Sequence, residues 1–449
     1  MSETSDLGTA RARTERCLAR IDDLNPRLGA VITPLHDHAR AQADELDAAA
    51  ARGEPQGLLH GMPVSVKDSF ATAGIRTTMG SGVYAEHVPA ADSEVVRRLR
   101  DAGAVLVAKD NMHEFASGQT TQNPHFGSCR NPWDTGRLPG GSSGGSAVTV
   151  ATGMATASVG TDAGGSVRAP AALCGVAGLR PTMGAISGWN DGLPDIAEFS
   201  ISGPLAREVT DLARVFVTLR GYDPRDPGSR RQPDDDLLGT LHDGIAGLRV
   251  GVAVGPWFAR VDPDVTAAVA NAVGVFESLG ARTHELLIPG LEENAAHNHA
   301  IRWSQGAAVL ARAYDETPEL IGADVRASIE DGRTISGTAY ADVVIWRQAW
   351  RRTIEQLFDE VDVIVSPTCP VTAPTITSPA WWMPVEGTLL RHWSMGGNPS
   401  LSLPCGFDRD DLPIGIEVAA PWWGEARLLG LGAAYQGATD WHGRQPTLA

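Results

Sequence analysis

Cysteine is scarce in this sequence: five of the 449 residues are cysteines, and no two of them form a C-x-x-C pair. Isolated cysteines argue against a disulfide framework and against a structural zinc site. Long apolar runs are absent as well, because none reaches the roughly 18 residues of a membrane span. The N-terminus also lacks the apolar segment behind a basic start that is typical of a signal peptide. We therefore expect a cytoplasmic protein that does not enter the membrane.

Positive charge is in deficit. Lysine and arginine number 37 against 54 aspartates and glutamates, which makes the formal net charge −17. A strongly negative chain binds phosphate backbones poorly, and we expect no nucleic acid among its partners. Apolar residues make up 43% and charged residues 20% of the chain, which is ordinary for a globular protein with a large buried core.

Helical and strand-like segments alternate along the chain. Helical periodicity covers residues 9–52, an apolar strand at 62–66 ends on Lys67, and a helix at 93–102 precedes an apolar strand at 104–108. Further helices and strands are expected in the remainder, with helices at 146–153, 210–220, 262–279, 339–358 and 425–438 and strands at 155–160, 248–254, 361–365 and 414–419. Apolar strands that alternate with helices are typical of a sheet covered on both faces.

No repeat and no long low-complexity linker divides the chain. We therefore predict the α/β class and a single large domain over residues 1–449, with a central mixed β-sheet covered by helices on both faces. In this domain the N-terminal helices occupy residues 9–52, a core occupies 59–220, and residues 245–449 complete the sheet and the substrate pocket. The stretch 221–236, rich in proline, glycine and charge, is expected to be a surface loop.

Two glycine–serine clusters lie close together in residues 138–168, LPGGSSGGSAVTVATGMATASVGTDAGGSVR. The apolar run between them is unlike a solvated linker. No lysine follows either cluster, which argues against a phosphate-binding P-loop, and no strand precedes the first cluster, as a dinucleotide fingerprint would need. The first cluster does match G-x-S-x-G, but the nucleophile elbow also requires a strand directly before its serine.

A strand-like run at 155–160 precedes the second cluster. It leads into the turn TDAGGS, whose last residue is Ser166. Successive glycines allow left-handed backbone and the close approach of a ligand. Consecutive N–H groups in such a turn can face an anion. A serine at the end of this turn is suited to acyl transfer, provided that a base activates it.

Four stretches, in order, resemble the amidase signature family: GMPVSVKDSF, AGAVLVAKDNMHEFASGQTTQNPHFG, NPWDTGRLPGGSSGGSAVTVATG and ASVGTDAGGSVRAPAALCGVAGLRPT. The match runs from Leu59 to Thr182 and continues more loosely beyond. The resemblance implies the α/β fold of that family and a serine hydrolase that cleaves the C–N bond of amides through an acyl-enzyme. It implies neither a metal nor an organic cofactor.

The resemblance also implies roles for individual residues. Lys67 corresponds to the catalytic base, Ser142 to a relay beside a cis peptide bond, and Ser166 to the nucleophile. The oxyanion hole would be formed by the backbone amides of Ala163, Gly164 and Gly165 together with that of Ser166.

Lys67 can act as a base only when its amine is neutral. The pKa of a free lysine is about 10.4, so that work near neutral pH requires this pKa to fall by about 2 to 3. Burial disfavours the charged amine, and the apolar Val64 and Val66 beside Lys67 are suited to provide it. On its own, a lysine next to Asp68 would be interpreted as one half of a salt bridge; only its combination with the two serines indicates catalysis.

The acyl and leaving groups are not defined by the catalytic residues. The family positions near the acyl group correspond to Ala116, Ser117 and Gly118. Twelve tryptophans are present, and one of them, Trp189, belongs to the loop-like stretch 186–201, which could border an aromatic pocket or act as a lid. We expect a small-molecule amide or carbamate as the substrate, with anilides, urethanes and esters as further candidates, and a homodimer as a compatible assembly.

Two other functions are compatible with the same motifs. The family includes the glutamine-hydrolysing A subunit of tRNA-dependent amidotransferases, although the stretch 186–201 departs from what that subunit would show. A non-catalytic binding protein on the same scaffold would be indicated by the loss of Lys67, Ser142 or Ser166, and all three are present. Arg168, just after the nucleophile, is interpreted as part of a structural ion pair in preference to a contact for an acidic substrate.

Overall fold

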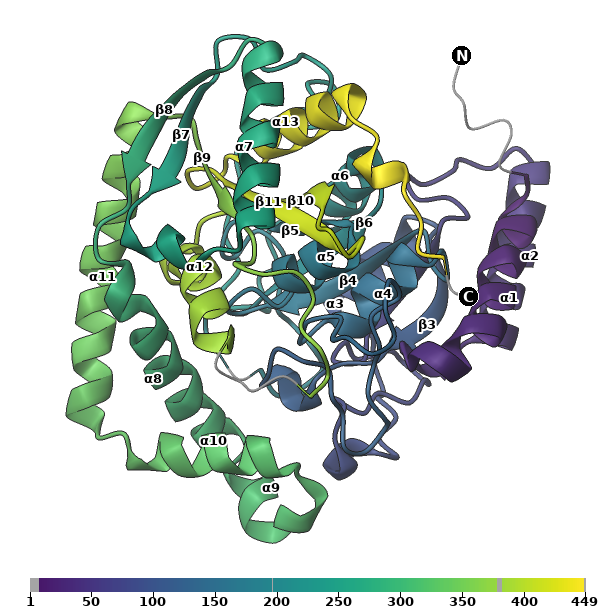
Figure 1. Cartoon of the computed structure of the whole chain (residues 1–449). Coiled ribbons are helices and arrows are strands. Elements are labelled where there is room, and N and C mark those ends of the chain that lie inside the picture. Colours follow the sequence, from purple (N-terminus) through teal and green to yellow (C-terminus); the bar gives the residue numbers. More distant parts are fainter. Residues whose placement is uncertain (1–7, 196, 378–381, 448–449) are drawn as a thin grey trace.

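A large mixed β-sheet runs through the protein (Figure 1). The structure, a computed structural model, describes residues 8–195, 197–377 and 382–447. Within these residues eleven strands form one sheet in the order β1-β3-β2-β4-β6-β5-β10-β11-β9-β7-β8. The strands are β1 (Val31–Pro34), β2 (Pro63–Lys67), β3 (Val105–Asp110), β4 (Ala157–Asp162), β5 (Ala177–Arg180), β6 (Ile201–Ala206), β7 (Arg249–Val254), β8 (Arg282–Leu287), β9 (Val363–Pro367), β10 (Ser400–Phe407) and β11 (Pro413–Ala419).

Parallel and antiparallel pairs both occur in this sheet. β2 pairs in parallel with β3 and β4, and β7 pairs in parallel with β8 and β9. The pairs from β4 through β6, β5, β10 and β11 to β9 are antiparallel. Every residue of β2, β3 and β6 is buried, because helices pack on both sides of the sheet.

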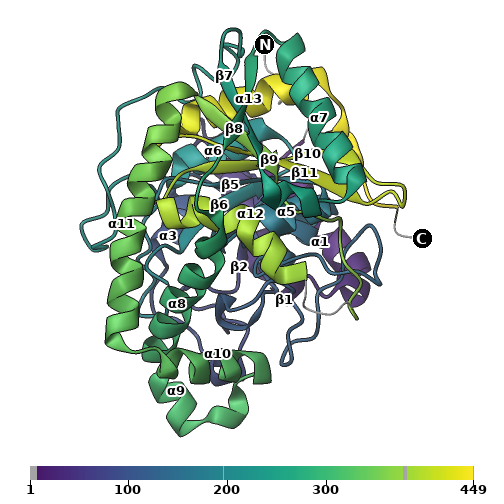
Figure 2. The same ribbon diagram turned by 60° about the vertical axis from the view of Figure 1, so that its left-hand side comes forward.

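Most of the helices fall into two layers and one outlying group (Figures 1 and 2), and α12 packs against α8 and α11. Apolar side chains of α3, α6, α7 and α13 share one core with the sheet, and those of α1, α2, α4 and α5 share a second core. None of the helices in the described residues is both long enough and apolar enough to cross a bilayer. The helices are α1 (Ala10–Leu28), α2 (His36–Ala51), α3 (Glu94–Asp101), α4 (Gly144–Ala151), α5 (Arg168–Cys174), α6 (Val209–Leu219), α7 (Pro263–Ser278), α8 (Leu291–Val309), α9 (Ala311–Glu316), α10 (Ala323–Thr334), α11 (Gly337–Glu360), α12 (Trp382–Gly396) and α13 (Glu425–Ala438).

The N-terminal region differs from the expectation of uninterrupted helices over 9–52. Helix α1 ends at Leu28 and is capped by Gly29, whose φ of 59° suits glycine. The chain then forms β1, which pairs antiparallel with β3 at the edge of the sheet, before α2 begins. A strand of four residues is too short for an alternating pattern to reveal it.

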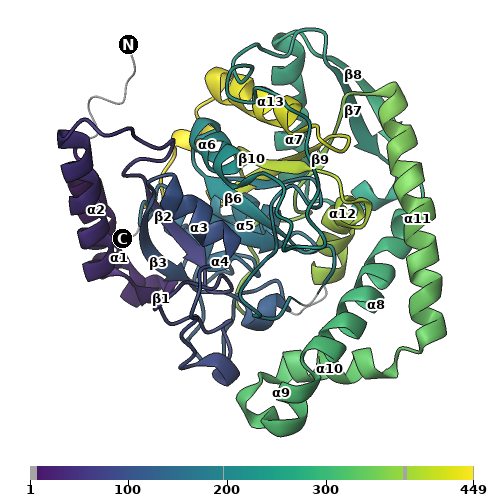
Figure 3. The same ribbon diagram turned by 180° about the vertical axis from the view of Figure 1, so that it is seen from behind.

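The outlying group consists of α8 to α11, which extend away from the sheet on the side opposite α1 and α2 (Figure 3). One residue of helix α8 nevertheless contacts the loop that follows β4. The Asn298 side chain on α8 donates a hydrogen bond to the carbonyl oxygen of Ala163, directly after β4, at 3.3 Å. A segment distant in sequence therefore borders the loop that follows β4.

Candidate active site

Lys67 is the last residue of β2 and is fully buried. Its Nζ atom lies 2.7 Å from Ser142 Oγ and 2.7 Å from Thr161 Oγ1. The peptide bond between Gly141 and Ser142 is cis. The structure thus brings together the lysine and the first of the two serines indicated by the sequence. Thr161, on β4, is a third contact that the sequence did not indicate.

The first glycine–serine cluster is a tightly packed turn. All residues from 138 to 150 are buried. A Cβ atom on Gly141 would lie 2.8 Å from the backbone carbon of Gln119, and a Cβ atom on Gly145 would lie 2.3 Å from the carbonyl oxygen of Asn111. Only glycine fits at these two positions, because any side chain would displace backbone on the facing segment. The cluster is therefore shaped for close packing around Ser142.

Burial lowers the pKa of Lys67 to about 7. Removal of the ammonium group from water is the main cause. The negative charges of Asp162 and Asp195 oppose the lowering, and the positive charge of Arg302 adds to it. A lowered pKa is what a general base needs, because a large fraction of the Lys67 amine is then uncharged near neutral pH.

The second glycine–serine cluster is the loop that leads from β4 to Ser166. Asp162 ends β4, and its carboxylate accepts hydrogen bonds from the N–H groups of Gly165 at 2.8 Å and Val167 at 3.1 Å. The N–H group of Gly165 therefore orders the loop through Asp162, and its place in the oxyanion hole stays a prediction. Within the described ranges, the N–H groups of this loop that make no hydrogen bond are those of Ala163, Gly164 and Ser166.

Ser166 is held against the first cluster. Its carbonyl oxygen accepts a hydrogen bond from the N–H of Ser143 at 3.2 Å, and only 6% of its surface is exposed. The Ser143 hydroxyl in turn donates to the carbonyl oxygen of Thr161 at 3.2 Å. On the other side, a Cβ atom on Gly165 would lie 2.4 Å from Leu390 Cδ1 on α12. The backbone around Ser166 is thus fixed by both clusters and by α12.

Two buried arginines hold Asp162. Arg168 donates from Nη2 to Asp162 Oδ1 at 2.9 Å and from Nε to Oδ2 at 3.0 Å, and Arg180 Nη1 lies 3.3 Å from Oδ1. Burial alone would raise the pKa of Asp162, but the two guanidinium groups hold it well below its usual range. Arg168 also pairs with the buried Glu417 at 2.5 Å. These contacts agree with the interpretation of Arg168 as part of a structural ion pair.

A cavity of about 390 Å³ is bordered by Thr161, whose hydroxyl contacts the Lys67 amine, although Lys67, Ser142 and Ser166 are not themselves among its lining residues. Thr161 and Ala116 belong to its wall, and much of the rest is supplied by the stretch 186–201, which includes Trp189. Ser117 borders a separate, very small cavity, and a Cβ atom on Gly118 would lie 2.2 Å from the His113 ring. Of the four residues predicted to bind substrate, Ala116 and Trp189 therefore line this cavity, and Ser117 and Gly118 do not.

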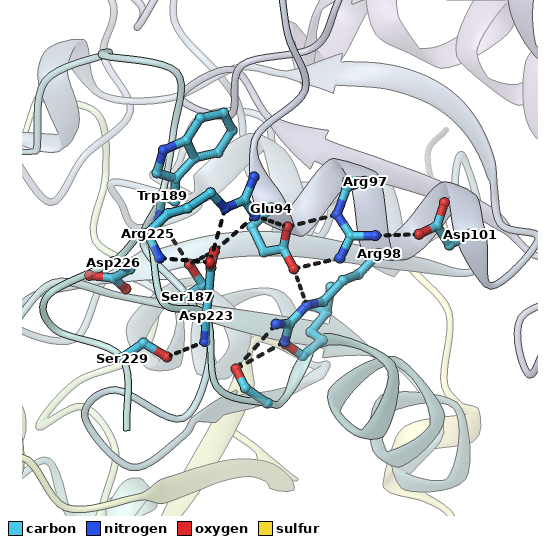
Figure 4. A network of polar contacts seen from close by, with 12 residues as sticks. Glu94, Arg97, Arg98, Asp101, Ser187, Trp189, Asp223, Arg225, Asp226 and Ser229 are labelled. Atoms are coloured by element: carbon cyan, nitrogen blue, oxygen red, sulfur yellow. Dashed lines mark hydrogen bonds and ion pairs between the residues drawn. The ribbon is translucent and has the colours of Figure 1, made fainter. Parts of the chain in front are cut away.

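Figure 4 shows how the first half of the stretch 186–201 is anchored. The Arg225 guanidinium lies 4.3 Å from the centre of the Trp189 ring, and the same arginine pairs with Asp223 at 2.9 Å and with Glu94 on α3. The Ser187 hydroxyl donates to Asp223 at 2.9 Å. A lid movement of this half would have to break this network or carry it along. The lid itself stays a prediction.

Two residues from later in the chain border the loop before Ser166 and were not indicated by any motif: Asn298 on α8 and Arg391 on α12. Two further residues of α8, His299 and Arg302, were not indicated either. Arg302 Nη2 lies 3.4 Å from the carbonyl oxygen of Ala116, and a Cβ atom on Gly164 would lie 3.5 Å from Arg391 Cγ. Their sequence context offers no signal, because single arginines on a helix are usually solvated.

The chain matches a family model described as Amidase over residues 12–429. The glutamyl-tRNA(Gln) amidotransferase A subunit of Azotobacter vinelandii is 37% identical over 468 residues, covering 96% of this chain and 95% of the relative. The protein of the same name from Roseiflexus is 38% identical and covers 97% of this chain and 94% of the relative. The chain therefore belongs to the amidase family and is an enzyme that hydrolyses amide C–N bonds, as the sequence predicts.

Solved structures confirm the predicted fold class. A structure of a vestigial protein complex, which concerns the evolutionary origins of an s-triazine catabolic enzyme, contains a chain with a TM-score of 0.91 and 34% identity, covering 97% of this chain and 96% of that one. The glutamyl-tRNA(Gln) amidotransferase A subunit from Thermotoga maritima has a TM-score of 0.80 and 28% identity, covering 97% of this chain and 92% of that one.

The expectation that nucleic acid has no place among the partners is wrong. The relatives named as A subunits of glutamyl-tRNA(Gln) amidotransferase, which match nearly the whole chain, belong to an enzyme named for a tRNA. The expectation rested on the net charge, which is a sum over the whole chain and does not describe a local binding surface. The net charge of one chain also says nothing of an RNA that another subunit of a complex could bind.

Proposed function

We propose that this enzyme hydrolyses amides through an acyl-enzyme on Ser166. The neutral amine of Lys67 accepts the proton of Ser142, Ser142 accepts that of Ser166, and Ser166 Oγ attacks the carbonyl carbon. The N–H groups without partners in the loop before Ser166 stabilise the oxyanion, each by about 3 to 4 kcal/mol in comparable sites. The observation that supports this assignment most directly is the 2.7 Å contact between the buried Lys67 amine and Ser142.

The second half of the cycle uses the same groups in reverse. When the tetrahedral intermediate collapses, the C–N bond breaks and the relay returns the proton to the leaving nitrogen, which departs as ammonia or an amine. Water then attacks the acyl-enzyme while the relay accepts its proton. The collapse of the second intermediate releases the carboxylic acid and gives the proton back to Ser166.

We further propose that the substrate is the side-chain amide of glutamine, and that the chain is the A subunit of a tRNA-dependent amidotransferase. This proposal is supported by the match, at 37% identity and across nearly the full length of both chains, to a protein named as a glutamyl-tRNA(Gln) amidotransferase A subunit. The ammonia released at Ser166 would then be used by the assembled enzyme on glutamyl-tRNA.

Glutamine hydrolysis with and without partner subunits tests this proposal. Ammonia release from glutamine is expected to be slow for the chain alone and to rise severalfold when the other subunits of the amidotransferase and glutamyl-tRNA are added. A panel of aliphatic amides, anilides, carbamates and esters serves as the comparison. Turnover of the panel with no hydrolysis of glutamine under any of these conditions would contradict the proposal.

A second candidate is an amide hydrolase that acts on other small molecules, carbamates included, without tRNA. It is favoured by the structural comparison: the TM-score is 0.91 for the chain from the s-triazine study and 0.80 for the amidotransferase chain of T. maritima. Under this alternative, the panel just described would contain a substrate that is cleaved much faster than glutamine, at a rate independent of other subunits.

The pH dependence of turnover is a direct consequence of the base assigned to Lys67. The pKa of its amine is lowered to about 7. We therefore expect kcat/KM to fall about tenfold for each pH unit below pH 6 and to become constant above pH 8. Only the deprotonated amine is active, so that activity must rise with pH. The profile is measured with a neutral substrate from the panel, and a flat profile between pH 5.5 and 9 would exclude this role of Lys67.

A further inference from the structure

Arg302 is a buried cation beside the candidate active site. It lies on α8 one turn after Asn298, the residue that contacts the carbonyl oxygen of Ala163, and residues four apart share one face of a helix. Only 8% of its surface is exposed. Its Nη2 atom donates to the carbonyl oxygen of Ala116, a residue of the cavity wall, at the long distance of 3.4 Å, and Arg302 itself borders the very small neighbouring cavity that Ser117 also lines.

The guanidinium group of Arg302 is not neutralised by the protein. Three other buried arginines near the site have carboxylate partners: Arg168 and Arg180 pair with Asp162, and Arg347 pairs with Glu198. Within residues 8–195, 197–377 and 382–447, Arg302 forms no ion pair, and its Nε atom has no hydrogen-bond partner. A buried charge without a partner is costly, which indicates that its counter-ion comes from outside the chain.

The groups around Arg302 add positive charge. Arg391 packs against the loop at Gly164. Burial lowers the pKa of His299 to about 2, and the charges of Arg391 and Arg302 contribute to the lowering. The imidazole therefore stays neutral, and it cannot serve as a counter-ion. Asp195, on the facing stretch, lines the cavity and is exposed to solvent, whereas the charge of the buried Asp162 acts on Arg302 without an ion pair between the two in the described residues.

We propose that Arg302 binds a carboxylate carried by the acyl part of the substrate, and that the enzyme thereby selects short amides of dicarboxylic acids over neutral amides. The planar guanidinium group suits a carboxylate, because its N–H donors match the two oxygens. This inference rests on the proposed amide hydrolysis at the same site. Glutamine carries such a carboxylate, whereas simple aliphatic amides and anilides do not.

Two substrates of matched length test the inference. Glutaric acid monoamide carries a carboxylate at the end opposite its amide, and hexanamide has an ethyl group in its place. Ammonia release is measured for wild type, Arg302→Gln and Arg302→Lys, with Arg312→Gln on α9 as the matched control because Arg312 is 87% exposed. Wild type is expected to prefer the monoamide by about 100-fold or more in kcat/KM.

Arg302→Gln is expected to lose that preference, so that its ratio of kcat/KM for the two amides falls close to one whatever its absolute rate on hexanamide. Arg302→Lys is expected to keep part of the preference, and Arg312→Gln all of it. Equal rates on the two amides in wild type would overturn the inference. Equal losses on both amides in Arg302→Gln would do the same, because they would indicate a structural role.

A binding measurement separates this inference from the proposed function. Calorimetry on the Ser166→Ala protein needs no turnover and compares glutaric acid monoamide with hexanamide, with and without Arg302→Gln. If no amide is hydrolysed but the monoamide binds only when Arg302 is present, the proposed function fails and the inference stands. If neither amide binds, or if both bind equally, the inference fails whatever the enzyme hydrolyses.

Discussion

Replacement of Ser166 by alanine is expected to lower kcat/KM for amide hydrolysis by about 10⁴- to 10⁶-fold, the range found for nucleophiles that act together with a base. Without the hydroxyl no acyl-enzyme forms, and Lys67 and Ser142 have no proton to accept. The fold is expected to survive, because the contact that holds this position uses the backbone: the carbonyl oxygen of Ser166 accepts from Ser143. Ammonia release and thermal unfolding, measured on the same sample, check both statements.

Ser142 and Ser143 provide a matched pair of controls for this experiment. They are neighbours in one buried cluster, but only Ser142 contacts the Lys67 amine, at 2.7 Å, whereas the Ser143 hydroxyl donates to the carbonyl oxygen of Thr161. Ser142→Ala is therefore expected to remove most of the activity, and Ser143→Ala to lower stability more than turnover. Substantial activity in Ser166→Ala, or equal losses in the two neighbours, would refute the assigned relay.

The strands that carry the site could be predicted because each contains a short, mostly apolar run that lies in the buried interior. The strand expected at 62–66 is β2 (Pro63–Lys67), and the one expected at 155–160 is β4 (Ala157–Asp162). The last helix has the expected bounds, Glu425–Ala438. Strands buried on both faces and helices with long apolar faces leave a strong local pattern, so that the α/β class follows from the sequence.

Other elements leave no such pattern, and they were missed. Strand β10, SLSLPCGF, contains a proline and a glycine, and its register with β11 shifts between Pro404 and Gly406. Helix α5, RAPAALC, has seven residues and an internal proline. Such segments are stabilised by their neighbours in the fold and not by local propensity. The antiparallel pairing of distant strands is likewise absent from any local pattern.

The same distinction applies to the site. The resemblance to the amidase signature motifs indicates Lys67, Ser142 and Ser166, because each motif is a continuous stretch of sequence. The motifs do not indicate that the N–H of Gly165 is engaged by Asp162, or that α8 brings Arg302 next to Ala116. These contacts join residues that are far apart in the chain or depend on the course of a single loop.

Asp162→Asn is expected to have the largest effect on stability. The substitution keeps the shape of the side chain but removes the charge that pairs with Arg168 and Arg180 in a fully buried site. Removal of one partner of a buried ion pair costs about 3 to 5 kcal/mol, because the other charges stay buried without compensation. Equilibrium unfolding in urea at pH 7 measures the loss. Turnover is expected to fall as well, since Asp162 also orders the loop before Ser166.

The pH dependence of this loss follows from the charge of Asp162. Its pKa is held well below the usual range in the folded protein, so that its contribution to stability is complete above the pKa of the unfolded chain, about 3.9. That contribution is lost only as the pH falls through the lower, folded value. Asp162 itself therefore adds no pH dependence between pH 6 and 8, and any slope in the difference between wild type and Asp162→Asn there comes from Lys67 and Glu417, whose pKa values of about 7 depend in part on the charge of Asp162. As a control, Asp264→Asn removes the carboxylate of the surface pair with Arg409 and is expected to unfold like wild type. If the two variants are equally stable, Asp162 does not hold the loop through its charge.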